Sequence, residues 1–193
     1  SDLNIASELT VLRDADVPVL WRPLHEASGG WFWWGNCEAE SYIKLYQLMY
    51  QIFTEEYELN NLIWVWNGQD ADWYPGDEYV DIIGQDIYPG YQVYTSRYPK
   101  FAETVGYTSA RKIITLSENG CLFDPDLAIR DGGIWSYFGT WNGEFISDSD
   151  VLNVYSEKYT DAEMLNKVYN HENVITRDEL PDLTTYPMED SVK

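Results

Sequence analysis

Two glutamates in this sequence stand where a carboxylate could do catalytic chemistry. Glu26 follows the apolar run 17–21, and Glu118 ends the apolar run 112–118. Each run has the length of a buried strand, and a glycine follows each glutamate within a few residues. Enzymes built as α/β barrels carry their catalytic groups at the carboxyl ends of parallel strands, so both are candidates. A lone glutamate after a strand is more often a helix cap or a surface residue, and that reading stays open.

Two carboxylates at one end of a sheet could together hydrolyse a glycosidic bond. When they lie about 5–5.5 Å apart, one attacks the anomeric carbon, while the other protonates the leaving oxygen and later activates water. The sequence gives neither the separation nor the role of each glutamate.

A tryptophan-rich loop follows Glu26. Three of the four residues 31–34 are tryptophans, and they come directly after Gly29 and Gly30. Tryptophans are more often core residues than ligand platforms, but these three cannot all face one core. We therefore expect some of them to line a cleft, where flat apolar rings would suit a sugar.

Apolar strands alternate with amphipathic helical segments along the whole chain. Periodicity predicts strands at 17–22, 62–66, 80–88, 112–118 and 134–141. It predicts helices at 4–15, 38–57, 95–106 and 160–170, a short helical turn after Pro125, and a loosely packed polar tail from 178. This alternation is typical of βαβ units, so the expected fold is α/β with a parallel sheet.

Composition excludes several classes of partner. The chain has 193 residues, the size of one domain, and its 45% apolar content is enough for a core. Its net charge of −21 argues against nucleic acids and anionic membranes as partners, although a solvated acidic surface explains the charge equally well. No apolar run reaches 18 residues, so we expect no membrane span.

Neither the cysteines nor the acidic residues predict a metal site or a cofactor. Cys37 and Cys121 each follow a candidate catalytic strand, so a bridge is conceivable, but two cysteines are not a disulfide framework and free thiols are favoured. Asp70, Asp72 and Asp77 crowd one loop without the spacing of a calcium-binding EF-hand loop.

The motif Arg22-Pro23-Leu24-His25-Glu26, followed by glycine and then Trp-Phe-Trp-Trp, resembles the acid/base strand of glycoside hydrolase family 26. This is the β-mannanase family of the retaining (β/α)8 clan. The stretches ending in Tyr88 and Glu118 are similar to later parts of the same family, and the resemblance covers about residues 8–180. It implies an endo-β-1,4-mannanase that cleaves mannan, galactomannan or glucomannan by double displacement. A β-glucanase or xylanase of the same family and a non-catalytic carbohydrate-binding barrel remnant are the alternatives.

The resemblance also implies roles for individual residues. Glu26 matches the acid/base and Glu118 the nucleophile, while Tyr88 and His25 are expected to hydrogen-bond and orient the nucleophile. The aromatic residues expected to bind the sugar are Trp31, Trp73 and Trp141.

Arg22 has two equally open interpretations. It could support the active site from below, or it could form a buried ion pair with Asp81 or Asp86. One departure from the family is Asn142, where some members carry arginine, which leaves the details of sugar binding there open.

Five predicted strands are three fewer than a (β/α)8 barrel requires. We therefore expect residues 1–193 to be the C-terminal portion of a catalytic domain, comprising about the last five βα units. A lost N-terminal segment or a second chain would complete the barrel, and this chain alone would be weakly active or inactive. The family also implies a secreted or cell-surface enzyme.

Overall fold

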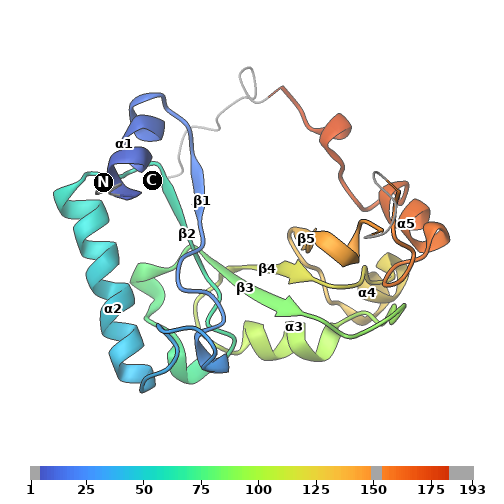
Figure 1. The fold of residues 1–193 in the computed structure, drawn as a ribbon, viewed down its shortest axis with the longest axis horizontal. Coiled ribbons are helices and arrows are strands. Elements are labelled where there is room, and N and C mark those ends of the chain that lie inside the picture. Colours follow the sequence, from blue (N-terminus) through green and yellow to red (C-terminus); the bar gives the residue numbers. More distant parts are fainter. Residues whose placement is uncertain (1–4, 149–153, 183–193) are drawn as a thin grey trace.

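A computed structural model describes residues 5–148 and 154–182. The described chain contains a parallel five-stranded sheet whose strands follow one another in sequence order, β1-β2-β3-β4-β5 (Figure 1). The strands are β1 (Val19–Trp21), β2 (Leu62–Trp66), β3 (Ile82–Ile87), β4 (Ile113–Asn119) and β5 (Phe138–Thr140). All five predicted strands are therefore present.

Helices lie on the outside of the sheet, and three of the five described connect consecutive strands (Figure 1). They are α1 (Ile5–Asp14), α2 (Ala39–Gln51), α3 (Tyr98–Val105), α4 (Pro125–Asp131) and α5 (Ala162–Tyr169). Side-chain caps fix two of the starts, because Asp124 accepts a hydrogen bond from the Asp126 amide and Asp161 accepts one from the Met164 amide. The helix predicted over 38–57 is α2 followed by one π-helical segment, Ile52–Glu56.

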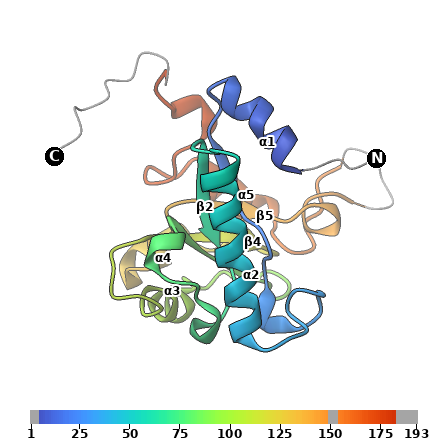
Figure 2. The same cartoon turned by 90° about the vertical axis from the view of Figure 1, so that its left-hand side faces the viewer.

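Much of the aromatic content lies in the layer between the sheet and the helices. The Trp64 ring of β2 lies 5.8 Å from Tyr46 and 4.8 Å from Tyr50, both on α2. Figure 2 shows α2 in the foreground with β2 behind it. The Trp66 ring, fully buried, lies 5.0 Å from Tyr74. Because side chains alternate along a strand, the residues between these tryptophans face the opposite, inner side of the sheet.

The inner side carries apolar residues at the amino-terminal ends of the strands. Register pairs Leu20 with Ile63, and Ile82 with Ile113, so these four share the face away from the helices. Leu20 is 53% exposed and Ile113 is 51% exposed. The run 17–21, predicted to be a buried strand, is therefore a short edge strand with a partly exposed inner face. The prediction was wrong there because β1 has a neighbour on one side only among the described residues.

Three further expectations concern the ends of the chain and the thiols. β5 is only three residues long, against the predicted 134–141, because its register with β4 shifts between Leu116 and Asn119. Cys37 is exposed and Cys121 is buried, and both thiols are free. Most of the tail predicted to pack loosely, from 183 onward, lies outside the described residues.

Gly84 of β3 provides a stability test of this packing. A Cβ at Gly84 would lie 2.2 Å from Ser117 Oγ and 3.0 Å from Asn67 Oδ1, so Gly84→Ala must displace both side chains. We expect the substitution to lower the free energy of unfolding by about 1–3 kcal/mol, measured by urea denaturation. Gly139→Ala is the matched control, because its Cβ would meet only Ser117 O at 3.4 Å. Equal stability of the two variants would contradict this packing.

Candidate active site

The carboxyl ends of the strands surround an open cavity of about 560 Å³. Residues at the ends of all five strands, or in the segments that follow them, contribute its lining. The lining residues are His25, Glu26, Trp31, Phe32, Gln69, Asp86, Tyr88, Glu118, Trp141 and Phe145. Both candidate glutamates thus reach the same cavity although 92 positions separate them in the sequence.

Three carboxylates converge in this cavity. One oxygen each of Glu26, Asp86 and Glu118 lies within 4.8 Å of the other two. Glu26 is held by its backbone, which adopts a left-handed conformation (φ 53°) and donates its amide hydrogen to Asn67 O at 2.7 Å. Sequence placed Glu26 and Glu118 at strand ends, and the structure brings them together.

Glu118 is almost fully buried and accepts a hydrogen bond on each oxygen. Arg22 Nη2 donates to Oε1, and the Tyr88 hydroxyl donates to Oε2 at 2.6 Å. Burial and the neighbouring Glu118 carboxylate hold the pKa of Tyr88 well above its usual range, so Tyr88 remains a donor. Two fixed donors are what an ionised carboxylate needs in a buried place.

Arg22 contacts both Asp86 and Glu118, so each of the two roles that the sequence left open has a counterpart in the structure. Its Nη1 donates to Asn67 Oδ1 at 2.9 Å and lies 3.3 Å from Asp86 Oδ2, while Nη2 reaches Glu118. It therefore contacts the carboxyl group of Asp86 and supports the Glu118 carboxylate at the same time. Asp81, the other carboxylate suggested for Arg22, instead accepts a hydrogen bond from the Trp64 amide at 2.8 Å.

Asp86 lines the cavity, although the sequence suggested it only as a possible partner of Arg22. Its side chain is completely buried, and burial raises its pKa to about 8 against the opposing charge of Arg22. The charges of Glu118 and Glu26 raise it further. Asp86 belongs to β3 and Tyr88 follows directly after its end, two positions later. Strand alternation was therefore the signal that could have placed Asp86 in the cavity.

His25 lines the cavity but contacts aromatic rings. Its ring lies 4.8 Å from Phe32 and 5.9 Å from Trp34. Partial burial and the nearby Arg22 charge lower the pKa of His25, so the ring is neutral at pH 7. In the described chain, Glu118 receives its hydrogen bonds from Arg22 and Tyr88, not from the histidine expected to orient it.

The three tryptophans expected to bind sugar lie in different places. Trp31 is 64% exposed and donates its indole hydrogen to Glu26 Oε2 at 3.0 Å. Trp141 is 42% exposed and lines the same cavity. Trp73 lies away from the cavity and packs against Tyr42 of α2 at 5.4 Å, so the structure places it in the core layer.

Within the described residues, the carboxylate trio is also the group whose spacing would admit a metal ion. Arg22 already contacts two of the three carboxylates, and Tyr88 occupies the second oxygen of Glu118. The positive charge that these acids need is thus supplied by a guanidinium.

No described helix combines the length and apolar character needed to cross a membrane.

Comparison with known proteins identifies the family. The family model described as glycosyl hydrolase family 26 matches residues 2–179. The chain belongs to glycosyl hydrolase family 26. This confirms the resemblance read from the Arg22 to Trp34 stretch.

Relatives in the family share more than a third of their aligned residues with this chain. A mannan endo-1,4-beta-mannosidase of Thermothelomyces thermophilus is 39% identical over 176 residues, which cover 91% of this chain and 34% of that enzyme. Mannan endo-1,4-beta-mannosidase B of a Piromyces species is 38% identical over 179 residues, covering 92% of this chain and 29% of its own length. The chain therefore spans about a third of the curated relatives it matches.

Solved structures in the family confirm the predicted fold class. A β-mannanase from a symbiotic protist of the termite Reticulitermes speratus, complexed with a gluco-manno-oligosaccharide, superposes with a TM-score of 0.81 at 41% identity. A Podospora anserina β-(1,4)-mannanase superposes with a TM-score of 0.83 at 38% identity. The match covers 92% of this chain in both cases, but 52% and 38% of those chains. The chain contains five consecutive parallel strands, with helices, of the (β/α)8 barrel type.

The raised pKa of Asp86 predicts how stability depends on pH. Between its ordinary value of 3.8 and about 8, folded Asp86 keeps a proton that the unfolded chain has released. The free energy of unfolding should therefore fall as pH rises through this window. Asp86→Asn, which has the same shape and cannot ionise, should reduce that slope in urea denaturation series between about pH 5 and 8.

Asp72→Asn, at an exposed aspartate of the 70–77 loop, is the matched control and should keep the original slope. An Asp86→Asn protein that retains the full slope would show that Asp86 is already ionised when folded.

Proposed function

We propose that this chain carries the two catalytic carboxylates of a retaining endo-β-1,4-mannanase, with Glu118 as nucleophile and Glu26 as acid/base. The observation that carries the proposal is the spacing of their oxygens, within 4.8 Å of each other. Retaining glycosidases place these groups about 5–5.5 Å apart, whereas inverting enzymes leave about 6.5–9.5 Å for a water molecule. The names of the family-26 relatives support mannan as the substrate.

In the first step, Glu118 attacks the anomeric carbon from its fixed position between Arg22 and Tyr88. The bond between that carbon and the glycosidic oxygen breaks as the covalent glycosyl-enzyme bond forms. Glu26, protonated, gives its proton to the departing oxygen. Two directional donors on the nucleophile keep its reactive oxygen aimed at one point, which lowers the entropic cost of attack.

In the second step, Glu26 acts as a base toward water. Water attacks the anomeric carbon from the side that the leaving group has vacated, Glu26 takes its proton, and the bond to Glu118 breaks. The Trp31 indole hydrogen bond to Glu26 Oε2 holds this carboxylate in one orientation through both steps. Buried Asp86, next to both glutamates, stays protonated at neutral pH and adds no third negative charge.

The aromatic lining supports a neutral polysaccharide as substrate. Trp31 and Trp141 present partly exposed rings to the cavity, which suit the apolar faces of a sugar. The net charge of −21 disfavours nucleic acids and anionic membranes as partners. A polymer of this kind is met outside cells, so we also propose a secreted or cell-surface enzyme.

Glu118→Ala tests the assignment of the nucleophile. In the full protein, the release of reducing ends from mannan, β-glucan and xylan should be highest on mannan, and Glu118→Ala should lower it by several orders of magnitude. The reason is that the substitution removes the group that forms the covalent bond to the sugar. Glu40→Ala, on the exposed surface of α2, is the matched control and should retain activity.

Two outcomes would contradict the proposal. Hydrolysis by a correctly folded Glu118→Ala protein would remove the nucleophile assignment. Binding of mannan by the original protein without any hydrolysis would instead favour the non-catalytic carbohydrate-binding alternative, and preference for β-glucan or xylan would favour the other enzymes of the family.

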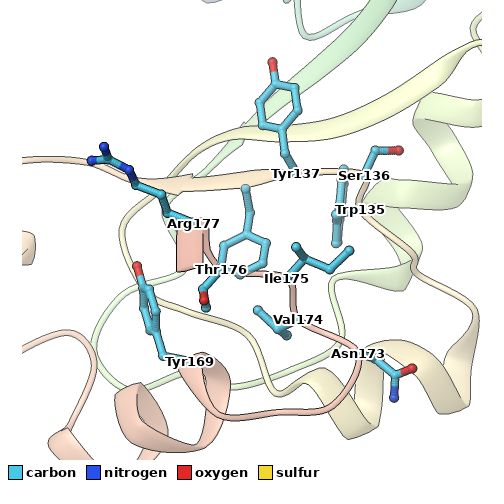
Figure 3. A pocket seen from close by; sticks show the side chains of 10 residues that line it. Trp135, Ser136, Tyr137, Tyr169, Asn173, Val174, Ile175, Thr176 and Arg177 are labelled. Carbon is cyan, nitrogen blue, oxygen red and sulfur yellow. The ribbon is translucent and has the colours of Figure 1, made fainter. Parts of the chain in front are cut away.

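We further propose that additional βα units of the same barrel type cover β1 and β5. Each of these strands has one neighbour within the described sheet, and the inner apolar side chains Leu20 and Ile113 are half exposed. A second cavity, of about 340 Å³, lies beside β5 between Trp135–Phe138 and the segment 173–177 (Figure 3). Uncovered parallel edges promote association, so a covering partner is expected, either in the same protein or as a second chain.

Light scattering on the isolated 193-residue chain tests this second proposal. We expect self-association, because the edges and inner face lack cover, and weak or absent hydrolysis, because one side of the cavity is open. A cooperatively folding, active monomer would contradict it.

A further inference from the structure

Four aromatic rings form a continuous row that begins inside the cavity and leaves it. The Tyr88 ring lies 5.3 Å from Phe145, Phe145 lies 4.4 Å from Tyr159, and Tyr159 lies 4.8 Å from Tyr91. Tyr88 and Phe145 line the active-site cavity, whereas Tyr91 and Tyr159 stand beyond it. We call these four residues the aromatic row.

The outer end of the aromatic row is held by hydrogen bonds to backbone. The Gln92 amide donates to Tyr159 O at 2.8 Å, and Gln92 Nε2 donates to Glu157 O at 3.0 Å. Next to these, the Tyr94 hydroxyl donates to Asp161 Oδ2 at 2.8 Å. The loop after β3 and the segment after β5 are therefore joined, and Tyr91 and Tyr159 keep a fixed relative position before any ligand arrives.

The chemistry of the outer end fits a sugar ring. The side chain of Tyr91 is 60% exposed, so much of its apolar ring is accessible to a ligand. Lys158 Nζ stands 5.3 Å and 5.2 Å from the Tyr91 and Tyr159 ring centroids and binds Glu144 Oε2 at 2.5 Å. An apolar face edged by an ammonium and a carboxylate offers stacking for a pyranose face and hydrogen bonds for its hydroxyls.

The aromatic row begins beside the proposed nucleophile. Its inner member, Tyr88, touches Glu118, the group that bonds to the anomeric carbon of the glycone. The leaving group departs toward Glu26, beside Trp31. The row thus extends from the nucleophile's side of the cavity.

From this continuity we infer that Tyr91 and Tyr159 form an additional subsite that binds a sugar unit of the β-linked chain beyond those held in the cavity. The inference rests on the proposed function, since it takes the same polysaccharide as ligand. An additional subsite predicts that the affinity for manno-oligosaccharides increases with their length and that Tyr91 contributes part of this increase. The catalytic residues alone do not lead to this expectation.

Calorimetric titration tests the inference. All proteins are full-length and carry Glu118→Ala, so that mannotriose and mannohexaose are not consumed. Adding Tyr91→Ala should weaken mannohexaose binding about threefold to tenfold relative to mannotriose binding, the range expected for one lost aromatic contact. Tyr91→Trp should restore the length dependence. Tyr98→Ala, at a 43% exposed tyrosine on α3, is the matched control and should leave the ratio of affinities unchanged.

The results separate this inference from the proposed function. If Tyr91→Ala leaves the ratio of the two affinities unchanged, or if Tyr98→Ala changes it equally, the subsite is refuted even when the original protein hydrolyses mannan. Hydrolysis by the original protein is measured separately and decides the proposed function alone.

Discussion

The guanidinium of Arg22 is the group on which the arrangement of the site depends. Three carboxylates with oxygens within 4.8 Å of one another would repel strongly if all were ionised in a partly dry cavity. Arg22 contacts Glu118 and Asp86, and it is fixed in turn by Asn67 Oδ1. Glu118 receives hydrogen bonds from Arg22 and Tyr88, whereas burial raises the pKa of Asp86. One cation is thus shared between two neighbouring acids.

The sheet makes this arrangement possible because it brings four distant segments to one edge. Arg22 follows β1, Asn67 follows β2, Asp86 belongs to β3 and Glu118 to β4. Parallel pairing aligns all of these strands with their carboxyl ends together. Gly84 leaves space between β3 and β4 for Ser117 and Asn67, so the strands can approach beneath the carboxylates. The aromatic layer against α2 fixes β2 from the outside, and the polar site is built on a rigid apolar support.

The order and type of the elements could be predicted from the sequence because each strand is a local apolar run bounded by turn residues. Glu26 and Glu118 could be recognised because each stands at the end of such a run. The contacts between side chains on different strands could not be predicted, since they depend on the register of the strands in the sheet. For this reason Arg22 kept two possible partners, and Asp86 was seen only as one of them. The environments of Trp73 and His25 could not be predicted for the same reason, because tertiary packing decides them. Trp73 packs against Tyr42. His25 packs against Phe32 and Trp34.

The central claim is that Glu26 and Glu118 are close enough for a covalent intermediate, so that hydrolysis proceeds with two inversions. Proton NMR of the first product released from a β-linked manno-oligosaccharide by the full protein measures this directly. The account predicts that the β-anomer appears first and equilibrates to the α-anomer afterwards. Initial release of the α-anomer would mean that water attacks in a single displacement, and it would contradict the geometry on which the account is built.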